Sequence, residues 1–117
     1  MKQLRQYILS LTFVAALTGC SSVEQRLPVG VYRDPSGPNF IAVSTNQIKI
    51  HIEGMDGRDE NGTGRAFRYA LWRDGRLFPI VQTSSEMYGY PALDYYWDGT
   101  KIVASDSKSK RAWQFTP

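Results

Sequence analysis

The chain has 117 residues, of which 21% are charged and 13% are aromatic, and it contains one cysteine and one histidine. This length accommodates one domain, and the aromatic content argues against intrinsic disorder. One cysteine and one histidine exclude an intrachain disulfide, a Cys/His zinc cluster and a Cys–His nucleophilic pair. We expect no metal and no cofactor.

The first 19 residues have the composition of a targeting segment. Lys2 and Arg5 provide a positive start, and an apolar run follows over residues 7–17. This run is too short for a membrane-spanning helix but suits the apolar region of a secretory signal peptide. It ends in Leu17-Thr18-Gly19-Cys20.

This motif resembles the lipobox of bacterial lipoproteins at all of its positions. The resemblance implies that residues 1–19 are a cleaved signal peptide and that Cys20 carries a diacylglyceryl group on its thiol. It also implies that a fatty acid such as palmitate acylates the new amino group, and several acyl chains on one residue give stable membrane anchoring. Serine in the position of Ser21 implies export to the outer membrane of a bacterial envelope, facing the periplasm.

Cleavage changes the charge of the chain. Removal of Lys2 and Arg5 leaves 12 of the 14 basic residues and all 11 acidic ones, so the mature net charge is +1. Because no basic stripe remains, we expect no nucleic-acid partner.

The mature chain begins with a short polar tether over residues 20–27, and residues 28–117 form the predicted domain. Apolar and polar residues alternate in this domain, as in Gln47-Ile48-Lys49-Ile50-His51-Ile52-Glu53, and glycine and proline interrupt the chain often. Alternation of this kind is typical of strands with one buried face, so the sequence predicts an all-β fold. The predicted strands are residues 29–34, 39–44, 47–53, 65–73, 76–82, 93–98, 101–105 and 111–116.

The connections between these strands sort into two kinds. Asp74-Gly75 and Asp98-Gly99 are typical of two-residue type I′ hairpins, and Asn46 lies in a third tight turn. On an antiparallel up-and-down meander, the tight turns all fall at one end and the longer loops at the other. The sequence therefore predicts about eight strands closing into a small barrel, with a two-sheet β-sandwich as the alternative. Strands of about six residues are too short for a transmembrane barrel.

Two short patterns bear on the kind of barrel. Gly30-Val31-Tyr32 is similar to the Gly-x-Trp of lipocalins, with tyrosine in place of tryptophan. Arg111 close to Trp113 is similar to the arginine that closes those barrels. This resemblance to calycins implies an architecture and not a ligand. In so small a domain we expect side chains, including Trp97 and Trp113, to fill the interior.

The candidate contact residues all lie in the longer loops. Tyr88 and Tyr90 lie in a Gly/Pro loop that suits stacking on a sugar or a protein contact, although both could instead fold down as a lid. Lys108 belongs to a small basic turn. Asp56 and Asp59 lie in an acidic glycine-rich loop, which matches only half of a calcium-binding loop and is better explained as a plain hairpin connection.

No catalytic constellation accompanies these residues. His51 is predicted to be an exposed strand residue, since no serine or cysteine nucleophile accompanies it. The sequence therefore predicts a non-enzymatic lipid-anchored envelope protein, a binding or assembly accessory whose partner is an envelope protein or a cell-wall glycan. The alternative is an inhibitor of host lysozyme, to which the short segment 94–101 is only loosely similar.

Overall fold

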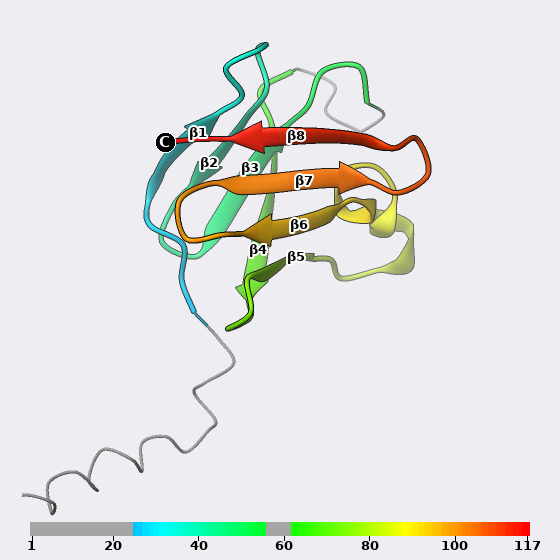
Figure 1. The fold of residues 1–117 in the computed structure, drawn as a ribbon. Coiled ribbons are helices and arrows are strands. Elements are labelled where there is room, and N and C mark those ends of the chain that lie inside the picture. The colour runs from blue at the N-terminus through cyan, green and yellow to red at the C-terminus, as the bar shows by residue number, and fades with distance from the viewer. Residues whose placement is uncertain (1–24, 56–61) are drawn as a thin grey trace, which may run out of the picture.

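The structure is a computed structural model that describes residues 25–55 and 62–117 (Figure 1). The described chain forms one antiparallel sheet in which every strand pairs with its neighbours in sequence, in the order β1 to β8. This confirms the predicted all-β meander. The strands are β1 (Gly30–Arg33), β2 (Phe40–Val43), β3 (Gln47–His51), β4 (Arg65–Leu71), β5 (Arg76–Ile80), β6 (Asp94–Trp97), β7 (Ile102–Asp106) and β8 (Arg111–Phe115).

The sheet curls until its first and last strands meet. The contact is a single bridge in which Arg33 N donates to Thr116 O at 2.7 Å and Thr116 N donates to Arg33 O at 2.9 Å. The fold is therefore a nearly closed barrel and not a two-sheet sandwich.

The two ends of the barrel differ as the meander requires. The tight-turn end holds the turns at residues 44–47, 72–76 and 98–101. The long-loop end holds the connections 34–39, 81–93 and 107–110 and the described parts of the β3–β4 connection, residues 52–55 and 62–64. Figure 1 shows the N-terminal chain entering at the tight-turn end. There Gln25 N donates to Leu71 O at 2.8 Å.

Two tight turns differ in type from the prediction. At residues 72–76, Gly75 N donates to Trp72 O and Trp72 N donates to Arg76 O, so the loop has three residues and not two. At residues 98–101, positive φ falls on Gly99 alone, which is typical of type II′. The prediction of type I′ turns is therefore wrong, since type I′ needs positive φ at both central residues. The carboxylates of Asp74 and Asp98 favour the observed turns, because they accept hydrogen bonds from the backbone N–H groups that follow them.

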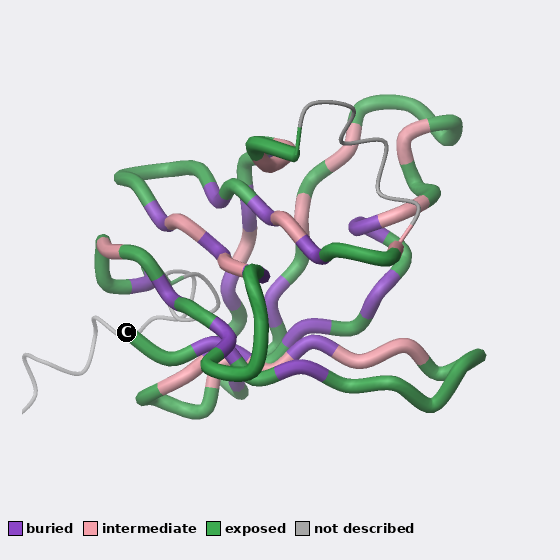
Figure 2. The backbone as a smooth tube through the Cα atoms, turned by 90° about the horizontal axis from the view of Figure 1, so that it is seen from above, coloured by how far each residue is buried: buried purple, intermediate pink, exposed green. Residues whose placement is uncertain are grey.

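The interior of the barrel is filled by side chains, as expected, and Figure 2 shows the buried positions alternating with exposed ones along the strands. Trp113 is buried, and Trp97 packs against the core from a partly buried position, with its ring 5.8 Å from that of Tyr32. Apart from these, the core consists of Leu27, Tyr32, Ile41, Val43, Ile48, Ile50, Ile52, Phe67, Tyr69, Leu71, Leu77, Tyr90, Leu93, Tyr95, Ile102, Ala104 and Phe115.

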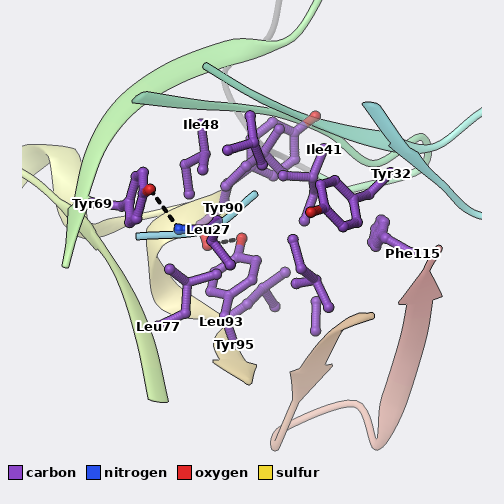
Figure 3. Close-up of a cluster of buried hydrophobic side chains, with 14 of the residues drawn as sticks. Leu27, Tyr32, Ile41, Ile48, Tyr69, Leu77, Tyr90, Leu93, Tyr95 and Phe115 are labelled. Carbon is purple, nitrogen blue, oxygen red and sulfur yellow. Dashed lines mark hydrogen bonds between the residues drawn. The ribbon is translucent and has the colours of Figure 1, made fainter. Parts of the chain in front are cut away.

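Leu27 shows that the end of the predicted tether belongs to the fold. Its side chain is buried at the tight-turn end, and its backbone N–H donates to the Tyr69 hydroxyl at 2.9 Å (Figure 3). The Tyr32 hydroxyl donates to Pro28 O at 2.8 Å. Two core tyrosines thus hold the N-terminal segment across this end of the barrel.

The sheet is weakest between β5 and β6, where only Arg76–Tyr96 and Leu77–Tyr95 pair. Trp97 N donates to Gly75 O, so Gly75 and Trp97 form a hydrogen-bonded pair of the antiparallel ladder. Because such pairs recur at every second residue, the following ones would be Leu77 with Tyr95 and then Pro79 with Leu93. Proline has no N–H, and Leu93 N donates instead to Tyr90 O. The ladder therefore stops at Leu77, and the two strands separate beyond it.

Gly75 allows the β4–β5 turn to reach β6. Its φ is +99°, and a Cβ added there would lie 2.5 Å from Trp97 O. Gly99 has nearly the same φ, +101°, with no heavy atom within 4 Å of an added Cβ. Alanine substitutions at Gly75 and Gly99 therefore separate the cost of backbone strain, which both share, from the cost of a steric clash, which only Gly75 has.

We predict that Gly75→Ala destabilises the protein more than Gly99→Ala. Gly99→Ala should cost about 1–3 kcal/mol through backbone strain alone, and Gly75→Ala should cost more because the carbonyl must also move. Urea unfolding of both variants measures the difference. Equal losses would show that the contact between the β4–β5 turn and β6 is looser than described.

Candidate functional site

The two loop tyrosines have different positions. Tyr90 is 1% exposed, and its hydroxyl accepts a hydrogen bond from Ile52 N at 3.1 Å and donates to Ile52 O at 3.3 Å. Tyr95 donates its hydroxyl to Tyr90 O at 2.7 Å (Figure 3). The interpretation of Tyr90 as an exposed contact residue is therefore wrong, because Tyr90 is a lid that covers the core at the long-loop end.

Tyr88, two residues earlier, is 66% exposed. It lies between two short 3-10 helices, η2 (Ser84–Met87) and η3 (Tyr90–Ala92). Gly89, with φ of +81°, separates the exposed ring from the buried one. The same loop thus seals the barrel with one tyrosine and presents the other to solvent.

Tyr88 and Lys108 line one cleft. This long-loop cleft has a volume of about 310 Å³ and lies between the β5–β6 loop and the β7–β8 turn. Its lining residues are Met55, Tyr88, Gly89, Ala92, Leu93, Asp106, Ser107 and Lys108. Two candidates that are 20 residues apart in sequence therefore lie in a single site.

Asp56 and Asp59 lie outside the described residues. Met55, which precedes Asp56 directly, lines the long-loop cleft. Asp56 therefore follows directly on a lining residue of the cleft in the sequence, and the roles of Asp56 and Asp59 stay predictions.

Asp106 shapes the turn that carries Lys108. Its carboxylate accepts hydrogen bonds from Ser109 Oγ at 2.9 Å and from Lys108 N at 3.0 Å, and these bonds hold the pKa of Asp106 below its usual value. Lys110 completes the turn with a φ of +63°. The cleft therefore has a fixed carboxylate and an ammonium group on one side and an exposed phenol on the other.

A buried polar pair braces the same end. Asn39 Nδ2 donates to Asp34 Oδ2 at 3.1 Å, and Asn39 Oδ1 accepts from Glu53 N at 2.7 Å, so the β1–β2 loop is joined to the end of β3. Asp34 also accepts from Ser36 Oγ at 2.7 Å and from Ser36 N at 2.9 Å. The bond from the Ser36 hydroxyl is the largest cause of the lowered pKa of Asp34.

A second cleft, missed by the sequence analysis, lies where β5 and β6 separate. This seam cleft has a volume of about 290 Å³ and exposes the rings of Phe78 and Tyr96 beside Arg76, Asp94 and Ser105. Both rings are nearly half exposed. The sequence did contain a signal for this cleft, namely Pro79 inside a predicted strand. Proline has no N–H to donate, so it interrupts the hydrogen bonds to the neighbouring strand on the side to which its nitrogen points.

Two core tyrosines have shifted pKa values. Burial is the main cause of the raised pKa values of Tyr95 and Tyr32, so both phenols stay protonated at neutral pH. The prediction that His51 is exposed is wrong, because His51 is partly buried and its ring lies 5.6 Å from that of Phe40. The described residues contain no group of three or more His, Cys, Asp or Glu side chains placed to hold a metal ion.

No protein-family model matches this sequence, and neither a curated protein nor a solved structure is significantly similar to it. Across residues 25–55 and 62–117, no helix has the length and apolar character needed to cross a membrane.

We predict that Asp34 makes stability depend on acid pH. The folded pKa is below the unfolded value of about 3.9, so the contribution of Asp34 is complete above that value and is lost as the pH falls through the folded pKa. Unfolding free energies of the wild type and of Asp34→Asn should differ near neutral pH and converge in strong acid. A difference that stays constant with pH would contradict this role.

Proposed function

We propose that this protein is a lipid-anchored component of a bacterial cell envelope that binds another envelope component through the long-loop cleft. It acts without catalysis, and its partner is an envelope protein or a cell-wall glycan. The lipobox-like motif ending in Cys20 supports the anchor, and Ser21 supports the outer membrane, facing the periplasm. The fold and the cleft support the binding role.

One observation carries the binding proposal. Tyr88 and Lys108 come from separate loops and line one cleft at the end of the barrel opposite the entry of the N-terminal chain. An exposed aromatic ring beside a flexible cation suits both a sugar ring and a protein contact. Because the anchor holds the other end, the long-loop cleft faces away from the membrane.

The anchor is tested by Cys20→Ser. We expect this variant to lose palmitate labelling and either to leave the membrane fraction or to accumulate with residues 1–19 still attached, because the thiol is the site of lipid transfer. Fractionation and intact mass of the wild type and the variant measure both effects. Palmitate labelling that persists in Cys20→Ser would refute the anchor.

The contact site is tested by Tyr88→Ser and Lys108→Ser. After crosslinking in whole envelopes and recovery of the protein, both variants should carry less crosslinked partner protein or glycan than the wild type. Their thermal midpoints should be unchanged, since both side chains lie at the surface. Phe78→Ser is the matched control, because it removes an exposed ring from the seam cleft. Loss of binding in Phe78→Ser alone would move the site to the seam cleft and contradict the proposal.

A further inference from the structure

The N-terminal segment leaves little slack between the proposed lipid and the folded domain. Gln25 N donates to Leu71 O and Leu27 N donates to the Tyr69 hydroxyl, so the described chain is fastened to the barrel from Gln25 onward. The chain from Cys20 to Gln25 reaches about 17 Å when fully extended. If Cys20 carries lipid, as the proposed function holds, the tight-turn end stays beside the bilayer.

The surface that the tether reaches has the residues of a membrane interface. Gln25, Trp72 and Arg73 line one hollow of about 270 Å³ together with the 98–99 turn. Trp72 is 40% exposed, and Val29, close to where the tether enters, is 70% exposed. Tryptophan settles at the boundary between lipid tails and headgroups, and arginine also serves as an anchor at the membrane interface.

The charge of this end complements an anionic surface. Arg76 and Lys101 pair with Asp74 and Asp98, at 2.9 Å and 3.2 Å. Arg26 and Arg73 add positive charge beyond these pairs, and the Arg26 guanidinium lies 5.7 Å from the centre of the Tyr69 ring. At the long-loop end, the described charges balance: Asp34, Glu53, Glu86, Asp94 and Asp106 against Arg33, Arg65, Lys108, Lys110 and Arg111.

We propose that the tight-turn end docks on anionic phospholipid, with the Trp72 ring at the interface and Arg26 and Arg73 beside the phosphates. The lipid anchor holds the protein at the membrane, and this surface sets its orientation. The short tether already favours a long-loop cleft that faces away from the bilayer, and docking fixes this orientation by limiting the tilt of the barrel. Basic side chains this close to an anionic surface attract it strongly.

The test uses the full lipid-bearing protein in vesicles of phosphatidylcholine, with or without phosphatidylglycerol, containing phospholipids brominated on the acyl chain. We expect tryptophan fluorescence to be quenched, more strongly with phosphatidylglycerol present. Trp72→Phe should remove most of this quenching, and Trp113→Phe, a change in the core, should keep it. Arg26→Gln and Arg73→Gln should each lower the ratio of docked to undocked protein about fivefold. Arg33→Gln and Arg111→Gln, on exposed arginines of β1 and β8 at the long-loop end, are the matched controls.

The outcomes separate this inference from the function on which it rests. A purified protein whose mass shows no lipid on Cys20 refutes the anchor, and the docking fails with it. A protein with lipid on Cys20 whose fluorescence is not quenched, or is quenched equally in Trp72→Phe, refutes the docking alone. Crosslinking of the Trp72 surface to another protein, without quenching, would assign this surface to a protein partner.

Discussion

The fold depends on four tyrosine hydroxyl groups that are buried in or beside the core. A buried hydroxyl without a partner is costly, so each must find a hydrogen bond within the protein. Here every one bonds to the backbone of a segment outside the strands. Tyr69 and Tyr32 hold the chain at Leu27 and Pro28, while Tyr90 and Tyr95 hold the lid against Ile52 and against Tyr90 O.

These bonds matter because the strands alone do not close the barrel. One bridge joins β1 to β8, and two residue pairs join β5 to β6. The two fastened segments cover the ends of the core instead, each with a buried side chain, Leu27 at one end and Tyr90 at the other. The same two segments bear on the proposed function: one fixes where the proposed lipid tether meets the barrel, and the other fixes which loop tyrosine remains exposed.

Much of the fold could be predicted from the sequence, because a strand with one buried face places an apolar side chain at every second residue. All the predicted strands are present, with ends within a few residues of the prediction, and their order follows from the alternation of short and long connections. The turn types were not predictable from Asp-Gly pairs alone, since the side chains of Asp74 and Asp98 compete for the backbone of the turn. Tyr88 and Tyr90 could not be separated either, because they share one loop and only a distant contact with Ile52 distinguishes them. The seam cleft required knowing that the Pro79 nitrogen faces β6.

The most direct measurement is the unfolding free energy of Tyr90→Phe compared with that of Tyr96→Phe. Tyr96 is the matched control, because it is a tyrosine on the outer face of β6 with a half-exposed ring. The account predicts that Tyr90→Phe loses about 1–3 kcal/mol, because Ile52 N–H is left buried without its partner, and that Tyr96→Phe loses little. Equal stability of the two variants would contradict the claim that buried tyrosine hydroxyls hold the segments that cover the ends of the core.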